Sequence, residues 1–197
     1  RLIAKTNRTG NGKNIFTLSF HVDYWNRLGW ADPFSQAAFS QRQSEYATTL
    51  SSSGTYTPQM VVNGTTEFVG SNESALNRAI AKALNTKSDA SFTKLNSVRK
   101  EGAPLKIEYS LDGNYTGAKV HFALVSPSET TVIKRGENGG LTLTNENVVR
   151  QFITTAANPS GSVTFSTSAM PAASNAYVVA YIQADNTGKV MGAARVK

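Results

Sequence analysis

The sequence predicts an α/β unit in residues 1–87, followed by an antiparallel β unit in residues 88–197. Three observations support this fold class. The first part contains an alternating apolar segment, then two amphipathic helical segments on either side of a proline-led hairpin. After Leu84 the apolar residues recur at every second position, which is typical of strands. The stretch from Asn85 to Ala90 is the expected boundary, and 40% hydrophobic residues allow a sizeable core.

Residues 15–22 are predicted to form a strand because apolar and polar side chains alternate along them. One face would carry the apolar residues Phe16, Leu18, Phe20 and Val22. The opposite face would carry Thr17, Ser19 and His21.

A helix is predicted from Asp32–Pro33 to about Leu50. Aspartate is a good N-cap, and proline suits the first helical position. Phe39, Tyr46 and Leu50 would share one face of this helix, and the polar stretch 51–54 would end it.

A β-hairpin is predicted next, with Asn63–Gly64 at its turn, because this dipeptide between apolar segments is a strong hairpin signal. Residues 59–62 would pair antiparallel with residues 65–69, and Pro58 would stand at the start of the first strand. A helix should follow, capped by Ser71 or Asn72. Its apolar stripe would consist of Ala75, Leu76, Ala79, Ile80, Ala83 and Leu84.

The second part is predicted to contain about seven short strands, an arrangement typical of an immunoglobulin-like β-sandwich. Leu105, Ile107, Tyr109 and Leu111 give the clearest alternation. His121 lies opposite the apolar face of its predicted strand and is expected to be solvated. The glycine-rich loop 134–140 would contact either the first part or a partner.

Several long blocks of sequence carry a resemblance to a known family. They are HVDYW at 21–25, LGWADPF at 28–34, YTPQMVVNG at 56–64, KRGEN at 134–138 and NVVR at 147–150. These blocks resemble the bacterial exported family catalogued as domain of unknown function 1223, and the resemblance covers the whole chain. It implies a thioredoxin-like domain with an appended β domain, a C-x-x-C-type segment at the start of the first helix, and a periplasmic or secreted location.

The order of strand, helix, X-Pro, hairpin and helix resembles the latter part of a thioredoxin fold. In that fold the proline before the hairpin is cis, and Thr57–Pro58 takes its place; a trans proline that merely begins a strand is the alternative. The resemblance also implies that the family's first strand and cysteines lie before Arg1. The first part would then be a truncated thioredoxin-like domain, completed by a partner, by the missing N-terminal strand or by a rearranged sheet.

We single out seven candidate binding residues: Tyr56, Thr57, Pro58, His21, Asp23, Trp25 and Trp30. The first three would contact an extended peptide or protein substrate, because the backbone beside the cis-proline pairs with substrates in folds of this type. The other four would flank the carboxyl end of a strand, where α/β sheets bind ligands, and the aspartate could tune a nearby thiolate. Alternatively, the histidine and aspartate hydrogen-bond the turn while the aromatic residues pack against the next helix.

Other kinds of site find less support. The sequence has no cysteine, so it offers neither a thiolate nor a disulfide. Ser19, His21 and Asp23 would lie ~6.6 Å apart along a strand, too far for a relayed hydrogen bond and with too few ligands for a metal. We therefore predict no catalytic residue, metal or cofactor. The net charge of +7 is spread along the chain without a basic run longer than two residues, which does not favour nucleic acid.

These observations together predict an exported thioredoxin-like protein related to thiol–disulfide exchange or peptide binding, and redox-inert in the sequence given. The alternative is a non-catalytic binding or envelope-structural module. No apolar run approaches the ~20 residues of a transmembrane helix.

Overall fold

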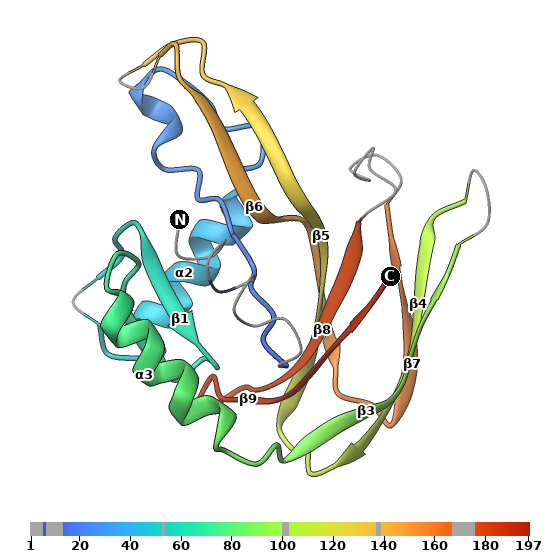
Figure 1. The fold of residues 1–197 in the computed structure, drawn as a ribbon. Helices are drawn as coiled ribbons and strands as arrows, with labels where there is room; N and C mark the ends of the chain where they lie inside the picture. Colours follow the sequence, from blue (N-terminus) through green and yellow to red (C-terminus); the bar gives the residue numbers. More distant parts are fainter. Residues whose placement is uncertain (1–5, 7–13, 53, 100–102, 137–138, 167–175) are drawn as a thin grey trace.

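The computed structural model describes residues 6, 14–52, 54–99, 103–136, 139–166 and 176–197. The first part contains η1 (Asn26–Leu28), α2 (Ala37–Thr49), β1 (Gln59–Val62), β2 (Thr66–Val69) and α3 (Glu73–Leu84). The second part contains β3 (Ala90–Val98), β4 (Leu105–Gly113), β5 (Ala118–Val132), β6 (Thr142–Ala156), β7 (Ser160–Phe165), β8 (Tyr177–Ala184) and β9 (Val190–Val196). Figure 1 shows α2, α3 and β1 on one side of the molecule and β3, β4 and β7 on the other. None of the described helices is long and apolar enough to span a membrane.

The predicted hairpin is confirmed as an antiparallel β1–β2 pair, in which Gln59 lies opposite Val69 and Val62 opposite Thr66. The turn has three residues, one more than predicted, and the N–H of Thr65 donates to the Val62 carbonyl at 3.2 Å. Asn63 and Gly64 take φ values of 48° and 71°, the left-handed conformation that asparagine and glycine tolerate best. The Thr57–Pro58 peptide bond before this hairpin is cis, as predicted. Among the described residues, β1 pairs only with β2.

The second helix, α3, begins where the sequence predicts. The side chain of Asn72 accepts a hydrogen bond from the Ala75 N–H at 3.0 Å, which satisfies one of the free donors of the first turn. Glu73 follows in that turn, where a negative charge complements the helix dipole. Leu76 and Ala79 are the buried members of the apolar stripe.

The first helix, α2, begins at Ala37 rather than at Pro33, so the predicted start is wrong. Asp32 caps a separate turn instead, since its Oδ1 accepts from the Phe34 N–H at 2.9 Å and its carbonyl accepts from the Ser35 N–H at 3.1 Å. The helix ends at Thr49, close to the predicted end, and Ser51 follows with a φ of 51°.

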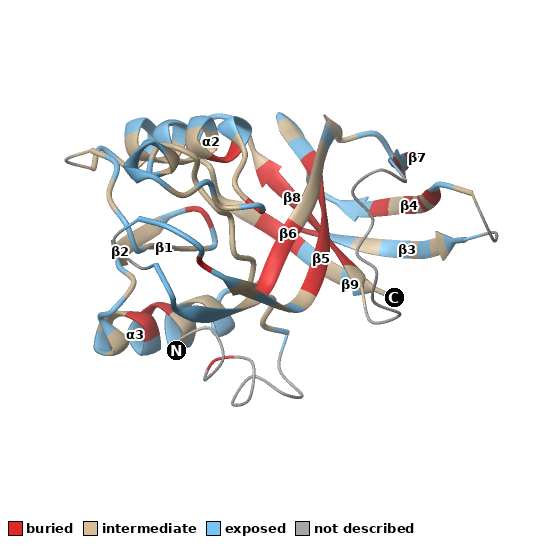
Figure 2. Ribbon diagram, turned by 90° about the horizontal axis from the view of Figure 1, so that it is seen from above, coloured by how far each residue is buried: buried red, intermediate tan, exposed pale blue. Residues whose placement is uncertain are grey.

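The second part consists of two antiparallel sheets with the strand orders β3-β4-β7 and β6-β5-β8-β9. Both sheets contribute to one core, in which Ile107 and Tyr109 of β4 and Phe122 of β5 are buried. The predicted alternation along β4 is confirmed, because its burial alternates residue by residue from Leu105 to Leu111. Figure 2 shows further buried residues concentrated on β5, β6 and β8, where the two parts of the chain meet.

Residues 15–22 do not form the predicted strand. Only Ser19 forms a bridge, parallel to Val148 of β6. The Ser19 N–H donates to the Asn147 carbonyl at 2.8 Å, and the Ser19 carbonyl accepts from the Val149 N–H at 3.0 Å. A side-chain hydrogen bond is found beside these two backbone bonds. Asn147, with a φ of 52°, donates through its side-chain amide to the Thr17 hydroxyl. The segment is therefore held by polar side chains at a point where β6 departs from regular geometry.

The apolar face predicted for this segment is nevertheless used. Phe16, Leu18 and Phe20 pack beside Phe39 of α2 against the outer face of the four-stranded sheet. The rings of Phe20 and Phe39 meet edge to face at 5.1 Å. Alternation thus identified the buried face, but the sheet that covers it belongs to the second part of the chain.

The same packing overturns the prediction that His121 is solvated. His121 is only 6% exposed, because α2 and the N-terminal segment cover this face of β5. Its ring stacks on Phe152 at 5.3 Å, and its Nδ1 lies 2.8 Å from the Thr154 hydroxyl. Burial, followed by the charges of Arg42 and Lys119, lowers the pKa of His121 to about 3.

Because His121 is buried, we expect the folded protein to become less stable in mild acid. Unfolding returns its pKa to about 6.5, so between these two values the unfolded state binds one proton more than the folded state. The free energy of unfolding should therefore fall as the pH drops below about 6.5, with a contribution of up to ~1.4 kcal/mol per pH unit from this residue. Urea unfolding at pH 7 and in mild acid measures this fall in the free energy of unfolding. The His121→Gln variant should lose this part of the pH dependence, and an unchanged slope would contradict the assignment.

The hairpin turn of the first part packs against the β8–β9 turn of the second. The Val190 N–H donates to the Asn63 carbonyl at 2.9 Å. Gly64 and Gly188 approach so closely that a Cβ on Gly64 would lie 1.8 Å from the Gly188 carbonyl oxygen. Gln183 lies against the same turn and donates to that oxygen at 2.5 Å. The two parts therefore meet backbone to backbone, which only glycine permits at this point.

Candidate functional site

The clearest group of predicted site residues surrounds Thr57. The indole Nε1 of Trp25 donates to the Thr57 hydroxyl at 3.0 Å, which joins residues from the loop before α2 and the loop before β1. Trp25 is 46% exposed, an unusual amount for so large an aromatic side chain, and Thr57 and Pro58 are also exposed. We call the surface formed by Trp25, Thr57 and Pro58 the Trp25 surface.

Gln43 of α2 forms hydrogen bonds with residues that flank the Trp25 surface. Its Oε1 accepts from the Tyr24 hydroxyl at 2.9 Å, and its Nε2 donates to the Tyr56 carbonyl at 2.7 Å and to Gln59 Oε1 at 3.0 Å. One amide side chain thus joins the Tyr24 side chain to the Tyr56 backbone and the Gln59 side chain. The sequence pattern does not single out Gln43 as a site residue, although Gln43 interrupts the helix stripe of Phe39, Tyr46 and Leu50. A polar side chain at a position that faces the core needs hydrogen-bond partners, and this need is the sequence signal that could have identified Gln43.

Tyr56 is anchored away from the Trp25 surface. Its hydroxyl donates to Glu67 Oε2 across the β1–β2 hairpin, and Gln59 Nε2 donates to the same oxygen at 3.1 Å. Burial, followed by the hydrogen bond and charge of Glu67, raises the pKa of Tyr56 to about 12. Tyr56 therefore remains a protonated donor at physiological pH, and of the three predicted peptide contacts it is the half-buried one.

His21 and Asp23 do not reach the Trp25 surface through their side chains. His21 Nδ1 lies 2.6 Å from Asp32 Oδ2, whereas Asp23 Oδ1 accepts from the Ser40 hydroxyl at 2.5 Å. Burial tends to raise the pKa of Asp32, but the hydrogen bonds from His21 and from the Phe34 N–H outweigh it and hold that pKa below its usual value. Both side chains thus form hydrogen bonds within the region before and at the start of α2. This arrangement corresponds to the alternative in which the histidine and the aspartate hydrogen-bond the turn.

Trp30 belongs to a different neighbourhood. Gly136, in the loop between β5 and β6, lies against the Leu28 carbonyl and the Cβ of Trp30. The described part of the 134–140 loop therefore contacts the first part of the chain, one of the two predicted outcomes, while residues 137 and 138 lie outside the described residues. In Figure 1 the chain before α2, drawn in blue, runs beside the far end of the long β5–β6 hairpin.

The backbone of the Trp25 surface is only partly hydrogen-bonded. The Pro58 carbonyl accepts from the Gly70 N–H at 2.7 Å, but within the described residues the backbone N–H and carbonyl of Thr57 form no hydrogen bond. An exposed and unpaired donor and acceptor can bind an extended chain in the manner of an added strand. The neighbouring indole offers a flat apolar face for one of its side chains.

Comparison with known proteins gives one family and one fold. The family described as "Protein of unknown function (DUF1223)" matches residues 1–183. A crystal structure of a protein from Agrobacterium tumefaciens is similar over 98% of this chain and 83% of that chain, with a TM-score of 0.69 and 24% sequence identity. At this identity the similarity concerns the fold alone. No curated protein matches the chain.

Proposed function

The chain belongs to the DUF1223 family, and from this membership we propose that it is part of an exported, thioredoxin-like protein that binds extended polypeptide segments. The binding site is the Trp25 surface. The observation that carries the proposal is that the exposed residue Thr57, whose backbone groups have no hydrogen-bond partner within the described residues, lies beside the exposed indole of Trp25. The second part, with its immunoglobulin-like sandwich, would hold the loop before α2 in place through the β5–β6 hairpin.

A role in thiol–disulfide exchange needs thiols that these 197 residues do not contain. In a protein that carries the thiol pair implied by the family resemblance, the Trp25 surface would hold the substrate polypeptide while exchange takes place. The chain described here would bind the same polypeptide without reacting with it.

Binding can be measured with reduced, carboxymethylated α-lactalbumin, a permanently unfolded polypeptide, by titration calorimetry. Trp25→Ala is expected to weaken binding by about tenfold, as is typical of an exposed aromatic anchor. Thr57→Val keeps the side-chain shape but removes the acceptor of the indole hydrogen bond, so we expect a smaller loss of about threefold.

Val98→Ala is the matched control, because Val98 is about as exposed as Trp25 but lies on β3, in the sheet on the other side of the molecule (Figure 1). It should leave the affinity unchanged. Absence of binding by the parent chain, or an equal loss in all three variants, would contradict the proposal and favour a structural module with no peptide site.

A further inference from the structure

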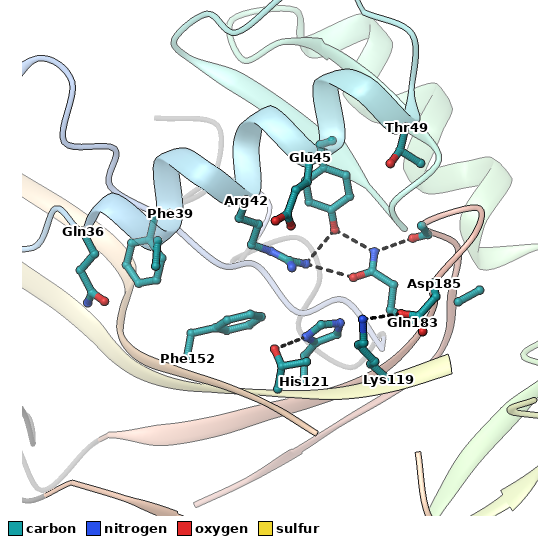
Figure 3. A pocket seen from close by; sticks show the side chains of 15 residues that line it. Gln36, Phe39, Arg42, Glu45, Thr49, Lys119, His121, Phe152, Gln183 and Asp185 are labelled. Atoms are coloured by element: carbon teal, nitrogen blue, oxygen red, sulfur yellow. Dashed lines mark hydrogen bonds and ion pairs between the residues drawn. The ribbon is translucent and has the colours of Figure 1, made fainter. Parts of the chain in front are cut away.

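A pocket separate from the Trp25 surface lies between α2 and the outer face of the four-stranded sheet. Its volume is about 470 Å³, within the range of small-molecule sites. Figure 3 shows Phe39 and Phe152 at one end, Lys119 and Asp185 at the other, and Arg42 above His121 between them. The pocket therefore combines an apolar end with a charged centre.

Arg42 is the fixed cation of this pocket. Its Nη2 donates to the Tyr46 hydroxyl at 2.9 Å, to the Tyr181 hydroxyl at 2.7 Å and to Gln183 Oε1 at 3.0 Å. The guanidinium carbon also lies 4.8 Å from the centre of the Phe152 ring. These contacts hold the guanidinium plane in one orientation, so that little entropy is lost when it binds a ligand.

The remaining donors of Arg42 are free. Within the described residues, Arg42 takes part in no ion pair, and its Nε and Nη1 have no hydrogen-bond partner. A purely structural role as a link between α2 and the sheet needs only the three Nη2 bonds. The Nε–H points toward the side of Nη2, and Nη1 lies on the side of Cδ, so the two free groups do not share an edge. Nη1 can still donate a charge-assisted hydrogen bond to a carboxylate.

The other charged groups restrict the ligand to one negative charge. Lys119 is already paired, because its Nζ lies 3.1 Å from Asp185 Oδ1. Glu45 is an exposed carboxylate that lines the pocket. Of the charged residues that line the pocket, only the cation Arg42 and the carboxylate Glu45 have no ion pair within the described residues. A single negative charge on the ligand is therefore favoured over the two charges of a phosphate dianion. His121 adds a ring nitrogen, Nε2, that has no partner within the described residues.

We propose that this pocket binds a small organic carboxylate with an apolar ring or branched body. The carboxylate accepts from the Nη1 group of Arg42, and the body lies against the rings of Phe39 and Phe152. The proposal does not depend on the Trp25 surface, since no residue of that surface lines the pocket.

Phenylacetate is the probe, and phenylacetamide, which has the same ring but no charge, is its control. Titration followed by NMR of the backbone amides and of the arginine side-chain Nε–H groups should show saturable shifts at Arg42 with phenylacetate. Phenylacetamide should bind about tenfold more weakly. Glu45→Gln should tighten phenylacetate severalfold because it removes a negative charge beside the site.

Two substitutions on neighbouring residues of α2 separate pocket binding from surface binding. Ala38 lines the pocket and Ala37 does not, and both are exposed, so neither change removes a hydrogen bond. Ala38→Trp should abolish phenylacetate binding, whereas Ala37→Trp should retain it. Arg42→Lys keeps the charge but loses the planar guanidinium and its fixed Nη1 donor, and should weaken binding about tenfold.

Three results would overturn the proposal: no saturable shift with phenylacetate, equal affinity for phenylacetamide, or unchanged binding by Ala38→Trp. Thermal unfolding of each variant shows whether it is folded. Since Ala37→Trp and Ala38→Trp add the same side chain to adjacent positions, a difference between them reports on the pocket.

Discussion

Replacing Gly64 by alanine is expected to lower the free energy of unfolding by about 3 kcal/mol or more. The left-handed φ of 71° costs a residue with a Cβ about 1–2 kcal/mol. In addition, the new Cβ would lie 1.8 Å from the Gly188 carbonyl oxygen, so the two turns must separate. Separation also breaks the hydrogen bond from Val190 to Asn63. Urea unfolding at neutral pH measures the loss.

Gly117→Ala is the control for backbone conformation. Gly117 has a φ of 66°, close to that of Gly64, but no atom lies within 4 Å of the position of its Cβ. This variant should lose only the ~1 kcal/mol of conformational strain. If the two variants lost the same free energy of unfolding, the contact between the hairpin turn and the β8–β9 turn would not contribute to stability.

Phe39→Ala is expected to cost about 3–5 kcal/mol, the usual range for removing a buried phenylalanine ring. Phe39 is 3% exposed and is the only residue of α2 that is buried. It packs against the outer face of the four-stranded sheet and edge to face with Phe20. Removing the ring therefore removes the main apolar contact between α2 and the four-stranded sheet. Amide hydrogen exchange should show a loss of protection concentrated in α2.

Phe165→Ala is a matched comparison, because Phe165 is fully buried in the core between the two sheets. It should lower the free energy of unfolding by a similar amount but leave the protection of α2 relative to the strands unchanged. Equal patterns of exchange in the two variants would show that α2 does not depend on Phe39 for its docking.

The elements that local sequence determines could be predicted. The hairpin at Asn63–Gly64 and the Asn72 cap of α3 depend on residues within a few positions of one another. The start of α2 could not be predicted in the same way, because the Gln36 N–H donates to the distant His21 carbonyl at 3.1 Å instead of joining a helical turn that begins at Pro33. Local patterns fail where a residue has a distant partner.

Partners distant in the sequence account for the remaining differences. Alternation along residues 15–22 indicates which side chains are buried, but it does not specify the strand that they meet. His121 was assigned to solvent because no local signal shows that α2 covers the other face of β5. The Trp25 surface was predicted residue by residue, yet the hydrogen bond from Trp25 to Thr57 and its support by Gln43 depend on the tertiary fold.

The face of the four-stranded sheet that carries Val125, Val149 and Val179 has a consequence for how the molecule unfolds. Phe16, Leu18, Phe20 and Phe39, which pack against these side chains, all precede the linker at 85–89. Cutting the polypeptide at that linker would expose apolar side chains of the sheet on one fragment and leave α2 without its packing partner on the other. We therefore expect both parts of the chain to unfold together in a single cooperative transition.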